Sequence, residues 1–192
     1  MLRPKGNKGK KWWDPVKENG PYGTGYWDEK GKRVTENLRG DNSRVIMDRA
    51  IPFMRSAAQN DQPFFTIIWF HTPHLPVVAG PEYTRMYADQ EKYAQHYYGC
   101  ITAMDEQVGR LRMELRALGV ANNTLVTFCS DNGPEGQANN APGTAGHLSG
   151  RKRSLLEGGI RVPGLIEWPG KVRPGNTAIP AVTSDYLPTI LD

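Results

Sequence analysis

The sequence predicts an α/β fold with a mostly parallel central sheet. Two continuously apolar runs, at 64–70 and 124–130, are typical of strands that are buried on both faces, as they are in a parallel sheet. A long amphipathic helical pattern lies between them, and this alternating order of elements is that of an α/β protein. A shorter run at 165–168 is a third strand candidate, and a last helix is predicted from Ser184.

The first 40 residues are expected to be irregular. They contain NGP and GTG turn sequences and several aromatic residues that follow no period. Basic residues cluster near the start, which favours a solvated and mobile end. We therefore divide the chain into an irregular aromatic and basic segment, 1–40, and a folded part, 41–192.

Two main helices are predicted. The first covers Asn42–Ala58, and Pro52 inside it is expected to kink or shorten it. The second covers Glu91–Leu118, and Gly119 is well placed to end it. The apolar residues of the second helix alternate spacings of four and three, which places them in one stripe. The stripe consists of Tyr97, Ile101, Met104, Val108, Leu111, Leu115 and Leu118.

Composition disfavours several classes of protein. The net charge is only +4, and the basic run Arg151-Lys152-Arg153 is too short, and too poor in aromatic neighbours, for a nucleic-acid surface. No apolar run reaches the roughly 20 residues that span a bilayer, and no signal peptide opens the chain. The two cysteines, Cys100 and Cys129, form neither a disulfide framework nor a C-x-x-C metal pair.

Polar residues follow the first two predicted strands. The first strand leads into His71 and His74, and the second ends in Asp131 and Asn132. Ligands of open α/β sheets bind at the carboxyl ends of the strands, so both clusters are candidates for a functional site.

Asp131 and Asn132 offer a carboxylate and an amide carbonyl. Both are hard oxygen donors, which suit Ca²⁺ or Mg²⁺ better than zinc. The alternative is that the Asp-Asn-Gly sequence forms an Asx turn where the chain leaves the strand. The tripeptide by itself leaves both interpretations open.

His74 and Lys152 are candidates for contacts with an anion. Pro73 and Pro76 stiffen the loop around His74, which could hold the imidazole as a proton donor. Lys152, placed in a cleft, would hold an anion as a point charge. A surface histidine and a solvated charge cluster are the alternatives. His71 is the weaker candidate, because it lies closer to the strand and is expected to be packed.

Taken together and in this order, the motifs resemble the sulfatases of the alkaline-phosphatase-like superfamily, of the arylsulfatase type. The matching stretches are PFFTIIWFHTPHLP, YYGCITAMDEQVGRL, NNTLVTFCSDNG, GRKRSLLEGGIRVPGLIEWPG and SDYLPTILD. The resemblance implies a partial α/β/α sandwich at 41–192. It also implies the later part of a catalytic domain, truncated at both ends.

The resemblance implies a role for each candidate residue. Asp131 and Asn132 fall where the family has two ligands of the active-site cation, usually Ca²⁺, with Mg²⁺ possible. His74 falls where a histidine touches the sulfate and assists the leaving group. Lys152 falls where a lysine binds the sulfate. The implied substrate is an aryl or carbohydrate sulfate ester, and the family is typically exported, periplasmic or secreted.

One part of the sulfatase pattern is absent from the 192 residues. The family nucleophile is a formylglycine made from the cysteine or serine of a Cys-x-Pro-Ser-Arg signature, and neither Cys100 nor Cys129 stands in that context. We therefore expect a sulfatase fragment that is inactive by itself. One alternative is a phosphatase or phosphodiesterase of the same superfamily, although a zinc site there would more naturally have a histidine at position 132 than the asparagine of this chain. The other is a non-catalytic α/β module that binds anions.

Overall fold

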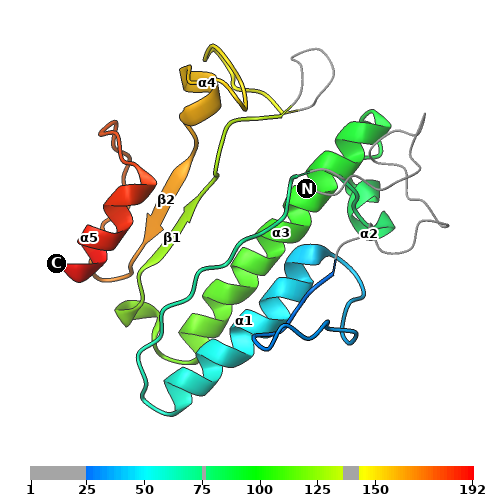
Figure 1. Ribbon diagram of the computed structural model, residues 1–192. Helices are drawn as coiled ribbons and strands as arrows, with labels where there is room; N and C mark the ends of the chain where they lie inside the picture. Colours follow the sequence, from blue (N-terminus) through cyan, green and yellow to red (C-terminus); the bar gives the residue numbers. More distant parts are fainter. Residues whose placement is uncertain (1–24, 75–76, 136–142) are drawn as a thin grey trace.

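The computed structural model describes residues 25–74, 77–135 and 143–192. Its helices are α1 (Asn42–Gln59), α2 (Pro81–Thr84), α3 (Lys92–Ala117), α4 (Glu157–Ile160) and α5 (Tyr186–Leu191). Short 3₁₀ turns are η2 (Arg85–Tyr87), η3 (Ala121–Asn123) and η4 (Thr183–Asp185). The strands are β1 (Val126–Cys129) and β2 (Gly164–Glu167), shown with the helices in Figure 1. Our expectations for residues 1–24 and for Pro76 lie outside the described part.

Helix α1 forms where the sequence predicts it. The Asp41 side chain caps it by accepting a hydrogen bond from the N–H of Ser43 at 2.7 Å. The helix then continues through Pro52, so this proline does not shorten it, and the kink that we named as the other outcome stays a prediction. Pro52 is exposed, whereas Ile51 and Met54 beside it are buried. Packing on the buried face compensates for the hydrogen bond that proline cannot donate.

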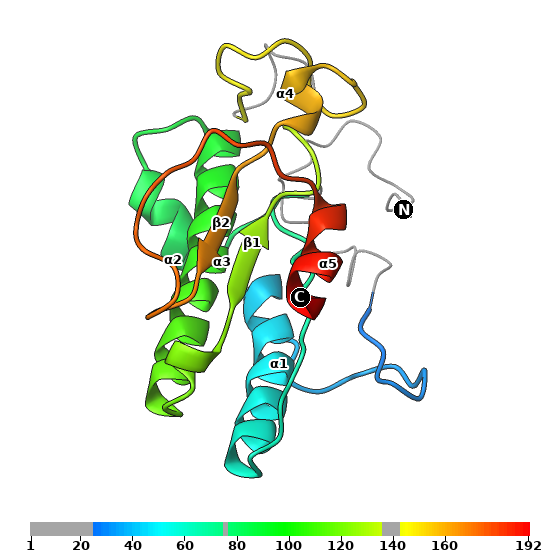
Figure 2. The same ribbon diagram turned by 90° about the vertical axis from the view of Figure 1, so that its left-hand side faces the viewer.

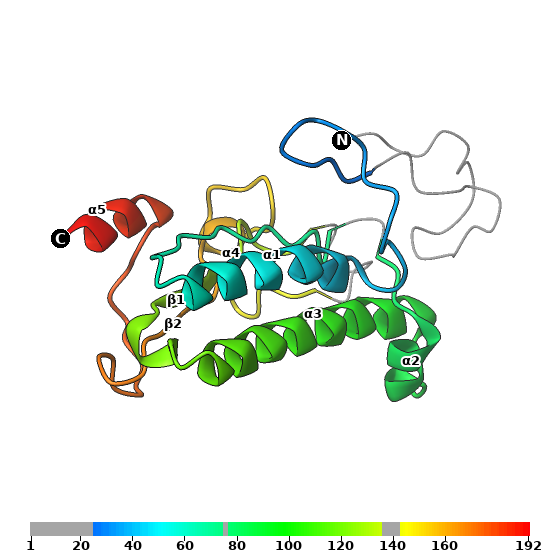
Figure 3. The same ribbon diagram turned by 90° about the horizontal axis from the view of Figure 1, so that it is seen from below.

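The core is centred on the contact between α1 and α3, and Figure 3 shows α1 lying along α3. Met47, Ile51 and Met54 of α1 are each 3% exposed or less, and they pack against Leu111 of α3. A second buried cluster joins the segment 77–79 to Cys100 in the first half of α3.

Among the described residues, no helix is both long and apolar enough to cross a membrane.

The run at 64–70 is not a strand, which corrects our prediction. Phe64, Ile68 and Phe70 pack on the core of α1, whereas Phe65, Ile67 and Trp69 are 69%, 63% and 83% exposed. This alternation of packed and exposed side chains has the two-residue period of an extended chain. In the described part of the protein, however, no strand forms a hydrogen-bonded ladder with this run. The side-chain pattern of a strand is therefore present without the pairing that defines one.

The predicted strands at 124–130 and 165–168 do form, but with each other. β1 pairs with β2 in antiparallel register, from Val126 opposite Glu167 to Cys129 opposite Gly164. The predicted parallel pairing of 64–70 with 124–130 is therefore wrong. Figure 2 shows the two strands side by side, with α3 behind them.

The direction of the two apolar runs nevertheless agrees with the prediction. In Figure 1, the segment at 64–70 and β1 rise toward the same end of the molecule, opposite to the direction of α1 and α3. The residues that follow both runs therefore lie toward one end of the structure. Helix α3 also ends as predicted, with Gly119 in the left-handed region at a φ of 73°.

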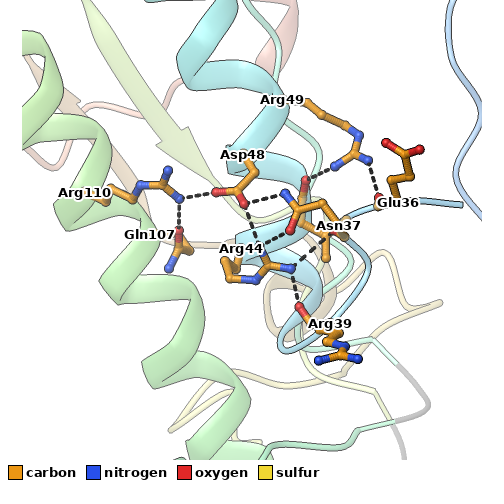
Figure 4. Close-up of polar contacts among 9 residues, drawn as sticks. Glu36, Asn37, Arg39, Arg44, Asp48, Arg49, Gln107 and Arg110 are labelled. Carbon is orange, nitrogen blue, oxygen red and sulfur yellow. Dashed lines mark hydrogen bonds and ion pairs between the residues drawn. The ribbon is translucent and has the colours of Figure 1, made fainter. Parts of the chain in front are cut away.

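A charged network joins α1 to α3 and to the segment before α1 (Figure 4). The Asp48 carboxylate accepts hydrogen bonds from Arg44 and Arg110, both at 2.5 Å, and from the Asn37 amide at 2.7 Å. The hydrogen bonds from Asn37 and Arg110 hold the pKa of Asp48 below its ordinary value. Because Arg110 belongs to α3, ionised Asp48 links the two main helices.

We predict that Met47→Ala lowers the free energy of unfolding by about 2–5 kcal/mol, because it leaves a cavity between α1 and α3. Met113→Ala is the matched control, since Met113 lies on α3 but is 62% exposed. Its effect should stay within about 0.5 kcal/mol. Urea unfolding followed by circular dichroism measures both changes. Equal effects of the two substitutions would contradict this account of the core.

We also predict that the stabilisation by Asp48 depends on pH. Its folded pKa is depressed, so the contribution is fully present above the unfolded pKa of about 3.9 and is lost as the pH falls through the folded pKa. The difference in unfolding free energy between the wild type and Asp48→Asn should be constant above about pH 5 and should shrink below about pH 4. Urea titrations at several pH values measure it, and a difference that stays constant down to about pH 3 would refute the prediction.

Candidate active site

A cavity of about 2290 Å³ lies between the segment at 64–70, α3 and β1. Most of the predicted apolar stripe of α3 lines it: Tyr97, Ile101, Met104, Val108, Leu111 and Leu115. The stripe thus faces the side on which a sheet was predicted. The most deeply buried positions of α3, such as Gly99 and Ala103, lie on a neighbouring face.

Asp131 and Asn132 follow β1 after Ser130, and both line the cavity. The Ser130 hydroxyl donates to the Asn132 carbonyl oxygen at 3.0 Å, and the Asn132 side-chain amide donates to the Gly133 carbonyl oxygen at 2.8 Å. These bonds are local, but they do not form the Asx turn that the sequence allowed at Asp131, because the Gly133 N–H donates to the Gly159 carbonyl oxygen. The Asp131 side chain is exposed. The bond from Asn132 to Gly133 is compatible with metal binding by Asn132, because it uses the amide hydrogens and not the side-chain oxygen.

His74 stands in a tight turn after the first apolar run. Its backbone N–H donates to the His71 carbonyl oxygen at 2.8 Å, and the two imidazole rings lie 5.1 Å apart between centroids. A cis peptide bond joins Thr72 to Pro73 within this turn. Both histidines line the cavity, but His74 is half-buried whereas His71 is exposed. Our expectation that His71 would be the more packed residue is therefore wrong, because the fold of this turn leaves His71 more exposed than His74.

Lys152 is brought to the cavity by contacts between two backbone segments. Its N–H donates to the Pro134 carbonyl oxygen at 3.1 Å, and the Gly133 N–H donates to the Gly159 carbonyl oxygen at 2.9 Å. A Cβ atom on Gly133 would lie 1.9 Å from the Gly158 carbonyl oxygen, so only glycine allows this approach. The glycines of the Glu157-Gly158-Gly159 sequence thus hold the loop after β1 against the segment that carries Lys152.

Five candidate residues from three separate segments of the chain line this one cavity. They are His71, His74, Asp131, Asn132 and Lys152. The structure also gives Lys152 a neighbour that the sequence did not indicate, since its ammonium group lies 4.0 Å from the Glu135 carboxylate. No spacing rule could have found this pair, because it depends on how the two loops dock.

Asp131 and Asn132 offer the type of oxygen ligand that a divalent cation needs, but they offer too few of them. A carboxylate and an amide oxygen are suitable ligands for Ca²⁺ or Mg²⁺, but Ca²⁺ takes roughly six to eight oxygens. No group of three or more histidine, cysteine or acidic side chains that could hold a metal occurs in the described parts of the chain. Asp131 and Asn132 could therefore supply only part of such a site.

The Cys100 thiol is not placed to act as a thiolate nucleophile. Burial raises the pKa of the Cys100 thiol to about 12, so this thiol is protonated at neutral pH. Cys129 is in β1 and forms a hydrogen bond with the Tyr186 side chain, which raises the pKa of Tyr186. Both cysteines are free thiols, as expected.

Comparison with known proteins gives one consistent result. The family model described as Sulfatase matches residues 6–192. The chain is similar to Arylsulfatase A of Homo sapiens, with 35% identity over 71% of this chain and 26% of the relative. It is also similar to the uncharacterized sulfatase YdeN of Escherichia coli, with 30% identity over 88% of this chain and 31% of the relative.

Solved structures agree with the sequence comparisons. The structure of Ps i-CgsB in complex with k-i-k-neocarrahexaose matches 73% of this chain and 30% of its own, with a TM-score of 0.66 and 32% identity. The PsFucS1 sulfatase from Pseudoalteromonas sp. matches 74% of this chain and 29% of its own, with a TM-score of 0.61 and 27% identity. The predicted fold class, part of an alkaline-phosphatase-like α/β fold, is confirmed. The chain spans less than a third of the length of each of these four proteins.

We predict that Gly133→Ala separates the loop after β1 from the segment at 158–159. The added methyl group would overlap the Gly158 carbonyl oxygen, and such overpacking costs about 1–3 kcal/mol. Gly109→Ala is the control, because a methyl group there would meet no other segment within 4 Å and alanine favours a helix by about 0.5–1 kcal/mol. Hydrogen exchange of the residue 133 amide and urea unfolding measure the two effects. Unchanged protection at residue 133 would contradict the docking described above.

Proposed function

The chain belongs to the sulfatase family, and from that premise we propose that it supplies metal-binding and sulfate-binding groups to a sulfuric ester hydrolase. One observation carries the proposal: candidate residues from three distant segments line the same cavity. If Asp131 and Asn132 only formed a turn, His74 only lay on the surface and Lys152 were only solvated, each would depend on its own segment alone. Local roles give no reason for the three to share one cavity.

Each assigned side chain has a chemical task that suits it. Lys152 binds the sulfate group, because a sulfate ester is already anionic and its charge must be neutralised as a nucleophile approaches sulfur. His74 stands near the departing oxygen and donates a proton to it. Asp131 and Asn132 contribute oxygen ligands to a divalent cation, Ca²⁺ or Mg²⁺. When bound, that cation would add positive charge against the sulfate oxygens.

The nucleophile of the proposed reaction is a formylglycine, which no residue of this chain supplies. Neither cysteine stands in a Cys-x-Pro-Ser-Arg sequence, so we propose that the chain alone does not hydrolyse sulfate esters. The proposed substrates are aryl or carbohydrate sulfates, and the proposed location is that of an exported, periplasmic or secreted protein. The family assignment favours this interpretation over a phosphatase, in agreement with the asparagine at position 132.

The metal assignment can be tested on the chain as it is. We expect Ca²⁺ to shift the backbone amide signals of Asp131, Asn132 and Gly133 in an NMR titration of the ¹⁵N-labelled protein. Binding should be weak, with a Kd of about 1 mM or higher, because two side chains provide only part of a calcium shell. Asp131→Ala should abolish these shifts.

Asp105→Ala is the matched control for this titration. Asp105 is exposed on α3 and is not among the residues that line the cavity. Its loss should leave Ca²⁺ binding unchanged. If Asp131→Ala binds Ca²⁺ as the wild type does, the metal assignment is wrong.

A further inference from the structure

Glu135 lies where the loop after β1 meets three consecutive basic residues. Its carboxylate forms an ion pair with Arg153 at 2.8 Å and lies 4.0 Å from the Lys152 ammonium nitrogen. Its carbonyl oxygen accepts a hydrogen bond from the Arg151 guanidinium at 3.1 Å. All three basic residues therefore engage Glu135, through either its backbone or its side chain.

Backbone contacts hold this arrangement in place. The Lys152 N–H donates to the Pro134 carbonyl oxygen at 3.1 Å, directly beside Glu135. The Arg151 guanidinium also donates to the Gly143 carbonyl oxygen at 2.6 Å. The main chains next to Glu135 and Lys152 are thus joined, and the separation of the two charged groups depends on their side chains alone.

The two ion pairs of the carboxylate differ in kind. The contact with Arg153 is a charge-assisted hydrogen bond of normal length, and it anchors the carboxylate. The 4.0 Å separation from Lys152 is too long for a hydrogen bond. The ammonium group therefore stays under the influence of the negative charge while its donors remain able to turn toward an anion. Because the Lys152 side chain is only 22% exposed, salt screens this influence less than it would at an open surface.

The charge of Glu135 reaches the cavity. Glu135 and Lys152 both line it, whereas Arg153 does not. Tyr93 also lines the cavity, and its pKa is raised first by burial and, to a smaller extent, by neighbours that include Glu135. An anion that approaches Lys152 from the cavity would therefore meet the field of this carboxylate.

We propose that Glu135 is a specificity-determining residue that disfavours doubly charged anions at Lys152. The inference rests on the proposed function, in which Lys152 binds the sulfate group. A sulfate ester carries one negative charge, whereas inorganic sulfate carries two and a phosphate monoester nearly two at neutral pH. Repulsion by a fixed carboxylate is proportional to the charge of the anion. Glu135 therefore favours a sulfate ester over a phosphate ester and promotes departure of the sulfate product.

The test compares one dianion with one monoanion. The ¹⁵N-labelled chain, as wild type and as Glu135→Gln, is titrated with inorganic sulfate and with methyl sulfate, and the amide signal of Lys152 is followed. With the carboxylate roughly 6 Å from the anion in a water-like dielectric, Glu135→Gln should bind methyl sulfate about threefold and sulfate about tenfold more tightly. A gain that is equal for the two anions, or absent, overturns the proposal.

Other variants separate charge from structure. Glu114→Gln removes a carboxylate that is also paired with an arginine, Arg55 at 2.7 Å, and should change neither affinity. Glu135→Asp keeps the charge and should keep the wild-type ratio of the two affinities. Glu135→Ala is a second neutral variant, and it should show the same change of ratio if Glu135→Gln does not fold.

Lys152→Met distinguishes this inference from the proposed function. If the substitution does not weaken sulfate binding, the role of Lys152 is wrong and both proposals fail. If it weakens binding while Glu135→Gln leaves the ratio of affinities unchanged, only the role of Glu135 is wrong.

Discussion

Helix α3 is the support on which most of the described structure depends. Helix α1 packs against it through Leu111, and the segment at 77–79 packs against it through Cys100. Near its last turns, Arg112 and Arg116 form ion pairs with Glu167 of β2, at 2.6 Å and 3.4 Å. Elements that are distant in sequence are therefore positioned relative to one another through a single helix. The Asp48 network adds a polar contact to the apolar one between α1 and α3.

Two faces of α3 meet different parts of the structure. The face that meets the segment at 77–79 includes small residues, and a Cβ on Gly99 would lie 2.8 Å from the Ala79 Cβ. Most of the larger apolar residues of the predicted stripe line the cavity, as do the extended run at 64–70 and β1. Polar residues then follow both of these segments at one end of the structure (Figure 1). The apolar cavity and the candidate active site are thus two parts of the same space.

Within the candidate site, opposite charges are held near each other without full neutralisation. The glycine contacts at Gly133 and Gly158 allow two backbone segments to touch, and this places Lys152 beside Glu135. Arg153 takes the direct contact with the carboxylate, so Lys152 is left at a longer distance. A cationic group that binds an anionic substrate and then releases a more highly charged product benefits from a neighbouring negative charge, since repulsion grows with the charge of the anion.

The sequence by itself determined the family, the fold class and most of the elements. Helices α1 and α3 and strands β1 and β2 lie within a few residues of their predicted positions, because periodicity and end signals are local properties of the chain. The motifs around His74, Asp131 and Lys152 indicated the sulfatase family, which the comparisons show.

Only the tertiary structure decided which segments pair and which charges meet. The run at 64–70 has the alternation of a strand but no ladder in the described structure, and β1 pairs with β2 instead, antiparallel. The greater exposure of His71 and the position of Glu135 beside Lys152 likewise follow from how the loops turn and dock. Hydrogen-bonded pairing and ion pairs depend on distances between segments far apart in the chain, and a pattern of residue types does not contain those distances.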